Sequence, residues 1–167
     1  VARSGAAEVN RAVELARRAQ PAWAETPGAR RGEVLREVAA ALGRRRREVA
    51  AIVARETGKS PRSALEETDG AVNLGFFFAG EGQRLHGRTI PSRVPNRRAF
   101  TLREPMGVAG LITAANTPIA NVAWKVFPAL ICGNAAGLTP AEDAPATAWV
   151  FGRVAAEHAG LEHGFGV

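Results

Sequence analysis

Residues 107–139 read GVAGLITAANTPIANVAWKVFPALICGNAAGLT, and this stretch decides the fold class. Gly107 to Ile112 is short, apolar and uncharged, which is typical of a strand buried on both faces of a sheet. Thr117-Pro118 predicts the cap and first turn of a helix whose apolar residues continue to Ile131. Ala135 to Thr139 predicts a second short strand. This order indicates a parallel sheet, in which ligands bind at the carboxyl ends of the strands.

The pattern continues with a helix that starts at Pro145 and ends near Gly160. A β-α-β-α order is the beginning of a doubly wound α/β sheet. Two parallel strands do not bury a sheet by themselves, because their apolar faces need neighbouring strands. We therefore expect the chain to be one piece of a larger α/β protein.

Upstream of the strands, apolar residues recur at helical spacing. The first helix spans about Gly5 to Trp23, with apolar side chains at three- and four-residue steps. Thr26 and Pro27 predict the N-cap and the first turn of a second helix. A third helix spans about Arg45 to Arg55. The first half of the chain is therefore predicted to be helical.

A fourth helix is predicted after Thr57-Gly58, where glycine permits a left-handed C-cap. Ser60-Pro61 restarts the helical pattern, and Ser63 and Glu66 have the spacing of a capping box. This helix should continue to about Arg84.

The period changes at Gly87, after which two mixed runs flank a turn. Residues 88–93 and 98–103 surround Pro95-Asn96, which predicts an antiparallel hairpin. Neither run has a clearly apolar face, so we do not expect the hairpin to be stable by itself. We expect it to lie against other parts of the protein or against another subunit.

Composition favours a protein of the cytoplasm. The net charge is +6, there is one cysteine, and no apolar run has the length of about 20 residues that a membrane span needs. The basic charge raises the possibility of nucleic-acid binding. However, acidic residues are interleaved with the arginines, and the run Arg44 to Arg47 covers all sides of a helix. We therefore expect neither a nucleic-acid partner nor a membrane partner.

A series of segments, taken in order, resembles the aldehyde dehydrogenase superfamily. A single Glu-Thr-Gly-Lys is a weak signal, whereas the whole series in the family's order and spacing is specific. The resemblance covers nearly the whole chain. The segments are AWA at 22–24, RETGKS at 55–60, REPMGVAG at 103–110, NTPI at 116–119, AWKVFPAL at 123–130, CGN at 132–134 and EDAPATA at 142–148.

The resemblance implies an α/β fold with amino-terminal helices, a bridging hairpin and the first two β-α units of an atypical Rossmann domain. Residues 1–86 would be the helical part of the cofactor-binding domain, and residues 87–104 the hairpin that joins subunits into homodimers or tetramers. Residues 105–167 would start the NAD(P)-binding domain, which in this family lacks a glycine-rich pyrophosphate turn. None is visible after Ile112. The catalytic domain would be absent from this chain.

For Asn116 the resemblance implies a catalytic role. In the family a cysteine thiolate attacks the aldehyde, and an amide side chain at this position donates to the resulting oxyanion. From local sequence alone, Asn116 would instead be read as the cap of the helix that starts at Pro118. The family's nucleophilic cysteine and general-base glutamate lie further along than this chain reaches, so the chain by itself is expected to be inactive.

Four residues are implied to bind the cofactor, NAD or NADP. Ile112 and Thr113 end the first strand, where plain strand packing is the alternative reading. Glu142 matches a family position that helps to select between a ribose hydroxyl and a 2′-phosphate, and its alternative is a helix-dipole partner. Thr139 departs from the family, which normally has a lysine there. The threonine brings no charge and has a shorter reach, which puts cofactor affinity in question.

No metal site is predicted. The three histidines, His86, His158 and His163, have no ligand spacing with one another or with Cys132, and we interpret them as surface residues. Cys132 follows an apolar helix with no cationic neighbour in sequence, so we predict a small buried hydrophobe, not a nucleophile.

Three functions remain to be compared. The first is an NAD(P)-dependent oxidation of a small aldehyde to a carboxylate. The second is a truncated, inactive relative that acts as an oligomerisation partner through its hairpin. The third, a nucleic-acid binder, rests on charge alone.

Overall fold

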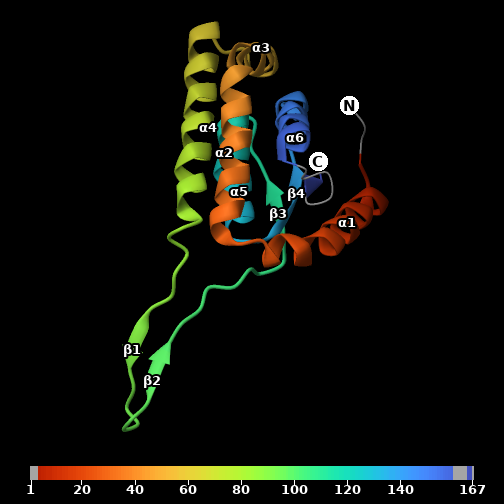
Figure 1. Cartoon of the computed structure of the whole chain (residues 1–167). Helices are drawn as coiled ribbons and strands as arrows, with labels where there is room; N and C mark the ends of the chain where they lie inside the picture. The colour runs from red at the N-terminus through yellow and green to blue at the C-terminus, as the bar shows by residue number, and fades with distance from the viewer. Residues whose placement is uncertain (1–3, 160–164, 167) are drawn as a thin grey trace.

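The computed structural model describes residues 4–159 and 165–166, which form helices and strands in a mixed order (Figure 1). Four helices come first, then a hairpin, then alternating strands and helices. In chain order the elements are α1 (Ala6–Glu25), α2 (Gly28–Arg44), α3 (Arg46–Thr57), α4 (Pro61–Glu81), β1 (Thr89–Pro91), β2 (Arg98–Phe100), β3 (Val108–Ile112), α5 (Pro118–Ile131), β4 (Ala135–Thr139), α6 (Pro145–Ala159) and β5 (Phe165–Gly166).

The central sheet is parallel and has the order β3-β4-β5. β3 and β4 pair in register from Val108 opposite Ala135 to Ile112 opposite Thr139. This confirms the predicted α/β class and both strand positions. The third strand was not predicted, because two residues are too few to show a strand period.

β3 is less buried than predicted. Its residues are partly or fully exposed, and Ile112 is 75% exposed, whereas β4 is mostly buried. The prediction of a strand covered on both faces was therefore wrong for β3. The physical reason is its place at the end of the sheet, where within the described residues only β4 pairs with it.

The core lies between the helices that precede the sheet and the helix α5 that joins its first two strands. The ring of Phe127 on α5 is fully buried and meets the ring of Phe151 on α6 edge to face at 5.6 Å. A Cβ atom at Gly75 on α4 would stand 2.7 Å from Phe127 Cζ. Glycine at this position therefore lets α4 approach α5 closely, and this packing sets the position of the two helices relative to each other.

One predicted helix start differs from the structure, and another is confirmed. Thr26 does not cap α2: it ends α1, and its hydroxyl donates to the Ala22 carbonyl, while α2 begins after Pro27. The predicted start of α4 at Ser60-Pro61 is confirmed: Ser60 is the N-cap, and its hydroxyl accepts from the Ser63 N–H, whereas Ser63 and Glu66 do not form the capping box that their spacing suggested. In each case two plausible capping residues stand close together, and only the backbone geometry selects one.

The Ser60 cap is testable by two alanine substitutions. Ser60→Ala should lower the free energy of unfolding by about 1 kcal/mol, because the Ser63 N–H loses its acceptor. Ser63→Ala should change it by less than about 0.5 kcal/mol, because this exposed side chain makes no hydrogen bond in the structure. Urea unfolding followed by circular dichroism measures both. A larger cost at Ser63 than at Ser60 would restore the capping-box assignment.

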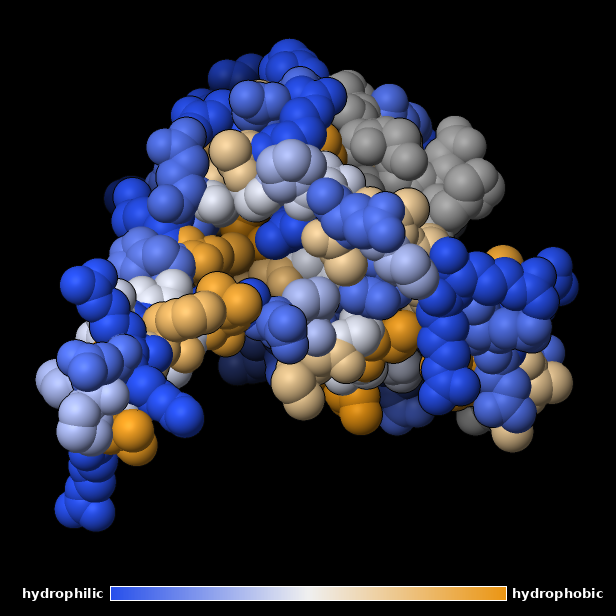
Figure 2. Space-filling view, turned by 60° about the horizontal axis from the view of Figure 1, so that its bottom comes forward, coloured by the Kyte–Doolittle hydropathy of each residue, from blue (hydrophilic) through white to orange (hydrophobic). Residues whose placement is uncertain are grey.

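The hairpin is present as predicted, with shorter strands. β1 and β2 pair antiparallel, from Thr89 opposite Phe100 to Pro91 opposite Arg98. All their residues are exposed, and Figure 1 shows the hairpin extending away from the rest of the described chain. Gly87 lies at its base, where a Cβ atom would overlap the Thr101 carbonyl oxygen. The space-filling view shows hydrophilic surface along most of this arm, with isolated apolar residues (Figure 2).

The carboxyl end of α5 is held by side chains from α1 and α2. Trp23 Nε1 donates to the Leu130 carbonyl at 2.8 Å, and Arg31 Nε donates to the Ile131 carbonyl at 3.0 Å. Gln20 Nε2 adds a bond to the Gly133 carbonyl at 3.2 Å. Burial lowers the pKa of the Arg31 guanidinium, and the nearby Cys132 sulfur opposes this shift. These donors satisfy carbonyl groups that a helix end leaves without partners.

Cys132 is exposed, so the prediction of a buried hydrophobe was wrong. The residue is the C-cap of α5, one step of about 100° around the helix from the buried Ile131, which takes it off the apolar face. In the described part of the chain, no helix is both long and apolar enough to cross a bilayer.

Candidate functional site

The carboxyl ends of β3 and β4 lie side by side. The N–H of Thr113, just past β3, donates to the Thr139 carbonyl at 3.1 Å. Thr113 is buried, whereas Ile112, Thr139 and Glu142 are exposed. The ends of the two strands that carry the predicted cofactor residues therefore meet at one edge of the sheet, where parallel sheets bind their ligands.

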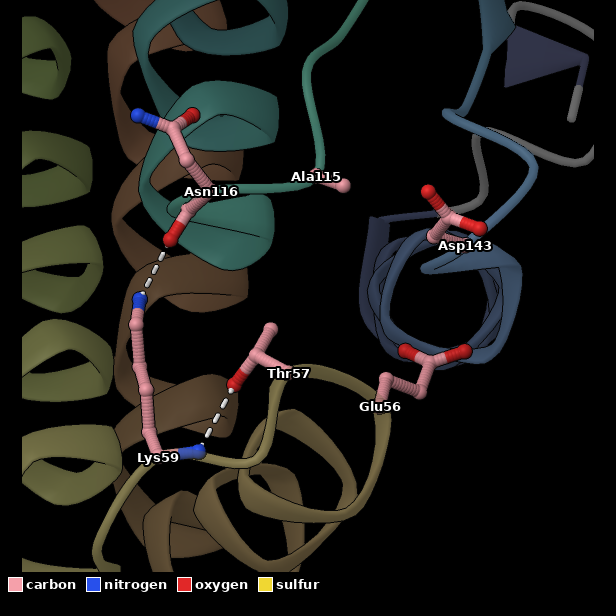
Figure 3. A pocket seen from close by; sticks show the side chains of 6 residues that line it. All are labelled: Glu56, Thr57, Lys59, Ala115, Asn116 and Asp143. Atoms are coloured by element: carbon pink, nitrogen blue, oxygen red, sulfur yellow. Dashed lines mark hydrogen bonds between the residues drawn. The ribbon is translucent and has the colours of Figure 1, made fainter.

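A polar hollow lies beside this edge, between the end of α3 and the loops that follow β3 and β4 (Figure 3). Its volume is about 440 Å³. Asn116 lines it, but the four predicted cofactor residues do not. The lining residues are Glu56, Thr57, Lys59, Ala115, Asn116 and Asp143. The sequence held a signal for four of them without a predicted role, because residues 56, 57 and 59 belong to the RETGKS segment and Asp143 belongs to the EDAPATA segment.

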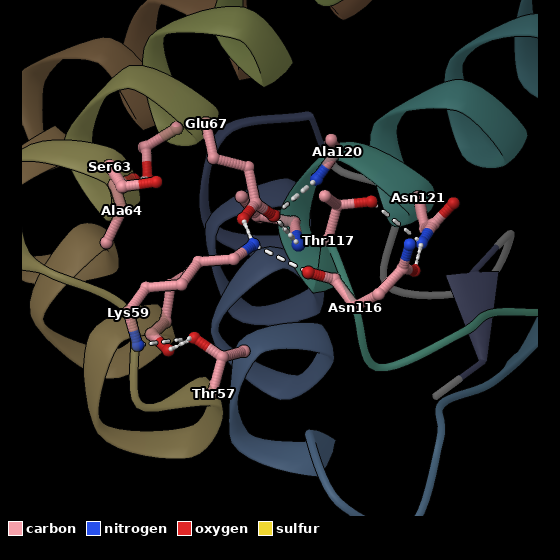
Figure 4. Close-up of polar contacts among 12 residues, drawn as sticks. Thr57, Lys59, Ser63, Ala64, Glu67, Asn116, Thr117, Ala120 and Asn121 are labelled. Atoms are coloured by element: carbon pink, nitrogen blue, oxygen red, sulfur yellow. Dashed lines mark hydrogen bonds and ion pairs between the residues drawn. The ribbon is translucent and has the colours of Figure 1, made fainter.

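Lys59 and Glu67 join this hollow to the start of α5 (Figure 4). Lys59 Nζ donates to the Asn116 carbonyl at 2.6 Å and forms an ion pair with Glu67 Oε2. The other oxygen of Glu67 accepts from the N–H groups of Ile119 and Ala120, at 3.1 and 3.3 Å. Glu67 therefore caps α5, and the Thr117 hydroxyl, predicted as the cap, makes no capping bond.

The side chain of Asn116 does not cap α5 either, so that alternative reading is wrong. Its Oδ1 accepts from Asn121 Nδ2 at 3.2 Å. Asn121 Nδ2 also lies 3.3 Å from the Ala114 carbonyl and 3.1 Å from Thr117 Oγ1. Asn121, on the first turns of α5, thus bonds to three residues of the preceding loop (Figure 4).

The start of α6 is capped in the same manner from α3. Glu56 accepts from the N–H groups of Ala146 and Thr147 at 2.7 and 2.8 Å, and from the Thr147 hydroxyl at 2.6 Å. A free helix N-terminus attracts phosphate. Here protein carboxylates occupy the N-termini of both α5 and α6. A pyrophosphate would be repelled from both positions, which agrees with the missing glycine-rich turn.

Cys132 lies at the other end of α5 from Asn116. The helix has 14 residues, so the two are separated by about 20 Å at 1.5 Å per residue. This distance excludes Cys132 as the nucleophile of a reaction at Asn116. Among the residues that the structure describes, no cluster of His, Cys, Asp and Glu has a metal-binding arrangement. His163, predicted as a surface residue, lies outside the described residues.

Comparison of the sequence with models of known protein families identifies the family of this chain. The family model described as "Aldehyde dehydrogenase family" matches residues 1–165. The chain belongs to the aldehyde dehydrogenase family. This confirms the resemblance seen in the sequence motifs, and the match covers the helices, the hairpin and the strands alike.

Individual relatives agree in sequence and in structure. The α-ketoglutaric semialdehyde dehydrogenase of Bacillus subtilis is 40% identical over 147 residues, covering 88% of this chain and 30% of the relative. The mitochondrial benzaldehyde dehydrogenase of Antirrhinum majus is 38% identical, covering 98% of this chain and 31% of the relative. An NADP-dependent enzyme from E. coli has a TM-score of 0.94 at 31% identity, covering all of this chain and 36% of that structure. The chain thus spans about a third of the length of these relatives.

Proposed function

We propose that the protein to which this chain belongs oxidises a small aldehyde to a carboxylate with NAD or NADP. The observation that carries the proposal is the Asn116 amide, held at the carboxyl edge of the sheet with its oxygen bonded to Asn121. The amide nitrogen has no partner among the described residues, so it can donate to a ligand. A neutral NH₂ suits a developing oxyanion, since it donates without losing a proton.

The cysteine nucleophile and the general-base glutamate would lie outside these 167 residues. The support for this is the coverage: the chain matches only 30% of the Bacillus relative's length. Within the chain, Asn116 would receive the oxyanion that forms when the thiolate adds to the aldehyde carbon. NAD(P)⁺, when bound, would supply the hydride acceptor, and water would then hydrolyse the thioester on the cysteine to release the carboxylate and the free thiol. Lys59 would hold the loop through the Asn116 carbonyl.

The residues at the strand ends fit the adenosine part of such a cofactor. The exposed Ile112 side chain offers an apolar surface for a flat base, while the Thr139 hydroxyl and the Glu142 carboxylate offer partners for ribose hydroxyls. We propose that Ile112, Thr113, Thr139 and Glu142 contact the cofactor there. Structurally similar proteins use either cofactor: the E. coli enzyme is NADP-dependent, and betaine aldehyde dehydrogenase of Staphylococcus aureus has a structure with NAD⁺.

Placing a lysine at position 139, as the family resemblance suggests, should strengthen cofactor binding. Thr139→Lys should lower the Kd for NAD(P)⁺ about tenfold, because one charge-assisted hydrogen bond contributes about 1.5 kcal/mol. Isothermal titration calorimetry measures this. Thr89→Lys, at an exposed hairpin position, adds the same charge away from the strand ends and should leave Kd unchanged. An equal gain in both variants would show an effect of net charge alone.

We also propose the family's division of the chain: residues 1–86 and 105–167 in the cofactor-binding part, and residues 87–104 as a hairpin that joins copies into a homo-oligomer in the cytoplasm. The hairpin exposes Ile90, Phe100 and Leu102, which could be covered by a second copy. This observation also favours a second candidate function, an inactive relative that acts as an oligomerisation partner.

The intact mass of the protein purified from its source separates the two functions. A mass well above 17.6 kDa, together with reduction of NAD(P)⁺ in the presence of aldehyde, is the result that the dehydrogenase proposal expects. A mass near 17.6 kDa without that activity would favour the partner function instead. The mass comes from electrospray spectrometry, and the reduced cofactor from its absorbance.

A further inference from the structure

The hydrogen bonds of Asn121 fix which end of the Asn116 amide faces outward. A backbone carbonyl can only accept, so the atom of Asn121 that meets the Ala114 carbonyl must be its NH₂ group. The same NH₂ group meets the side chain of Asn116 at 3.2 Å. The atom of Asn116 at that contact must therefore be its oxygen.

The consequence for Asn116 is that its own NH₂ group points away from Asn121. Figure 4 shows the Asn116 and Asn121 side chains meeting beside the start of α5. The backbone of Asn116 is held separately, because Lys59 Nζ donates to its carbonyl. Lys59 fixes where the residue lies, and Asn121 fixes which atom of its amide is presented.

We propose that Asn121 is a positioning residue, which holds the Asn116 amide with its donor end toward the aldehyde oxygen. This inference rests on the proposed function for its catalytic meaning, but the orientation itself can be tested without activity. Were the amide turned over, Asn116 would present an oxygen to the oxyanion and would repel it. An amide left free to rotate would present its donor for only part of the time, which weakens preorganised stabilisation.

Hydrogen exchange of the side-chain NH₂ groups tests the orientation in the ¹⁵N-labelled protein that contains this chain. In the unmodified chain, the Asn121 NH₂ group should exchange slowly with solvent and the Asn116 NH₂ group quickly. Asn121→Asp replaces the donor with an acceptor of the same shape, so Asn116 should turn over and its NH₂ group should become protected. Asn10→Asp, at an exposed position on α1, is the matched control and should change neither group. A slowly exchanging Asn116 NH₂ group in the unmodified chain would overturn the proposal.

Kinetics of aldehyde oxidation in the protein from its source test the consequence. Asn121→Asp should lower kcat about as much as Asn116→Ala does, by about 10²- to 10³-fold. Asn121→Ala, which removes the bond without adding a charge, should give a smaller loss. The double variant Asn116→Ala/Asn121→Asp should be no slower than Asn116→Ala, because Asn121 acts through Asn116.

The outcomes separate the two proposals. Additive losses in the double variant would show that Asn121 acts independently of Asn116 and would overturn the positioning role. An unchanged kcat in Asn116→Ala would instead remove the oxyanion role of Asn116, and the exchange rates would then still decide the amide orientation.

Discussion

Replacing Asn116 with alanine is expected to lower kcat for aldehyde oxidation by about 10²- to 10³-fold, which is the usual cost of removing one oxyanion donor. The KM for the cofactor should change little, because Asn116 is not among the residues that we assign to the adenosine. Steady-state assays with an aldehyde and NAD(P)⁺ measure both constants. The loss should fall on kcat and kcat/KM together, as for an interaction made only in the transition state.

The fold should survive this substitution. Lys59 bonds to the backbone carbonyl of Asn116, and Glu67 caps α5, so neither contact needs the Asn116 side chain. We expect the free energy of unfolding to change by less than about 1 kcal/mol, consistent with an exposed position. Asn10→Ala on α1 is the matched control and should retain full kcat. An Asn116→Ala enzyme with unchanged kcat would contradict the proposed role.

Removing the carboxylate of Glu67 is expected to have the largest effect on stability, about 3 kcal/mol of unfolding free energy. The Glu67 side chain is only 7% exposed, and that of Lys59 is 23% exposed. Glu67→Ala leaves Lys59 without a carboxylate to balance its charge, and leaves the Ile119 and Ala120 N–H groups without an acceptor. Glu67→Gln retains one acceptor oxygen and should cost less.

The neighbouring Glu66 provides the control. Its side chain is 65% exposed and pairs with Arg62 on the same helix at 3.0 Å. Such surface pairs contribute about 0.3–0.5 kcal/mol, so Glu66→Ala should be nearly neutral. Urea unfolding of both variants gives the comparison. Equal costs at positions 66 and 67 would mean that the capping role assigned to Glu67 is wrong.

The order of elements could be predicted from the sequence because each element has a local signature. The strand at residues 135–139 and the helix from Pro118 follow from runs of apolar residues and a first-turn proline. Cys132 was mistaken for a buried residue because an apolar run does not reveal the phase of a helix at its last turn. β5 was missed because a two-residue strand depends on pairing with β4.

The site was only partly predictable for a different reason. Asn116 followed from the family resemblance, but the groups that orient it come from distant parts of the chain. Glu67 is 52 residues from Ile119, and Glu56 is 90 residues from Ala146. No spacing rule relates such residues, so which carboxylate caps which helix could be read only from the packing of α3 and α4 against the strand-linked helices.

Fixing α5 at both ends has a mechanical consequence. A carboxylate holds its positive end and the Arg31 guanidinium holds its negative end, so both poles of the helix dipole are balanced by the protein itself. The helix is therefore held at both ends, between the amino-terminal helices and the sheet. Partial unwinding at either end would break a hydrogen bond to a charged side chain, so amide exchange along α5 should be as slow as global unfolding allows. The loop before α5 is therefore attached to a rigid helix. Its residues should need little rearrangement when charge develops nearby.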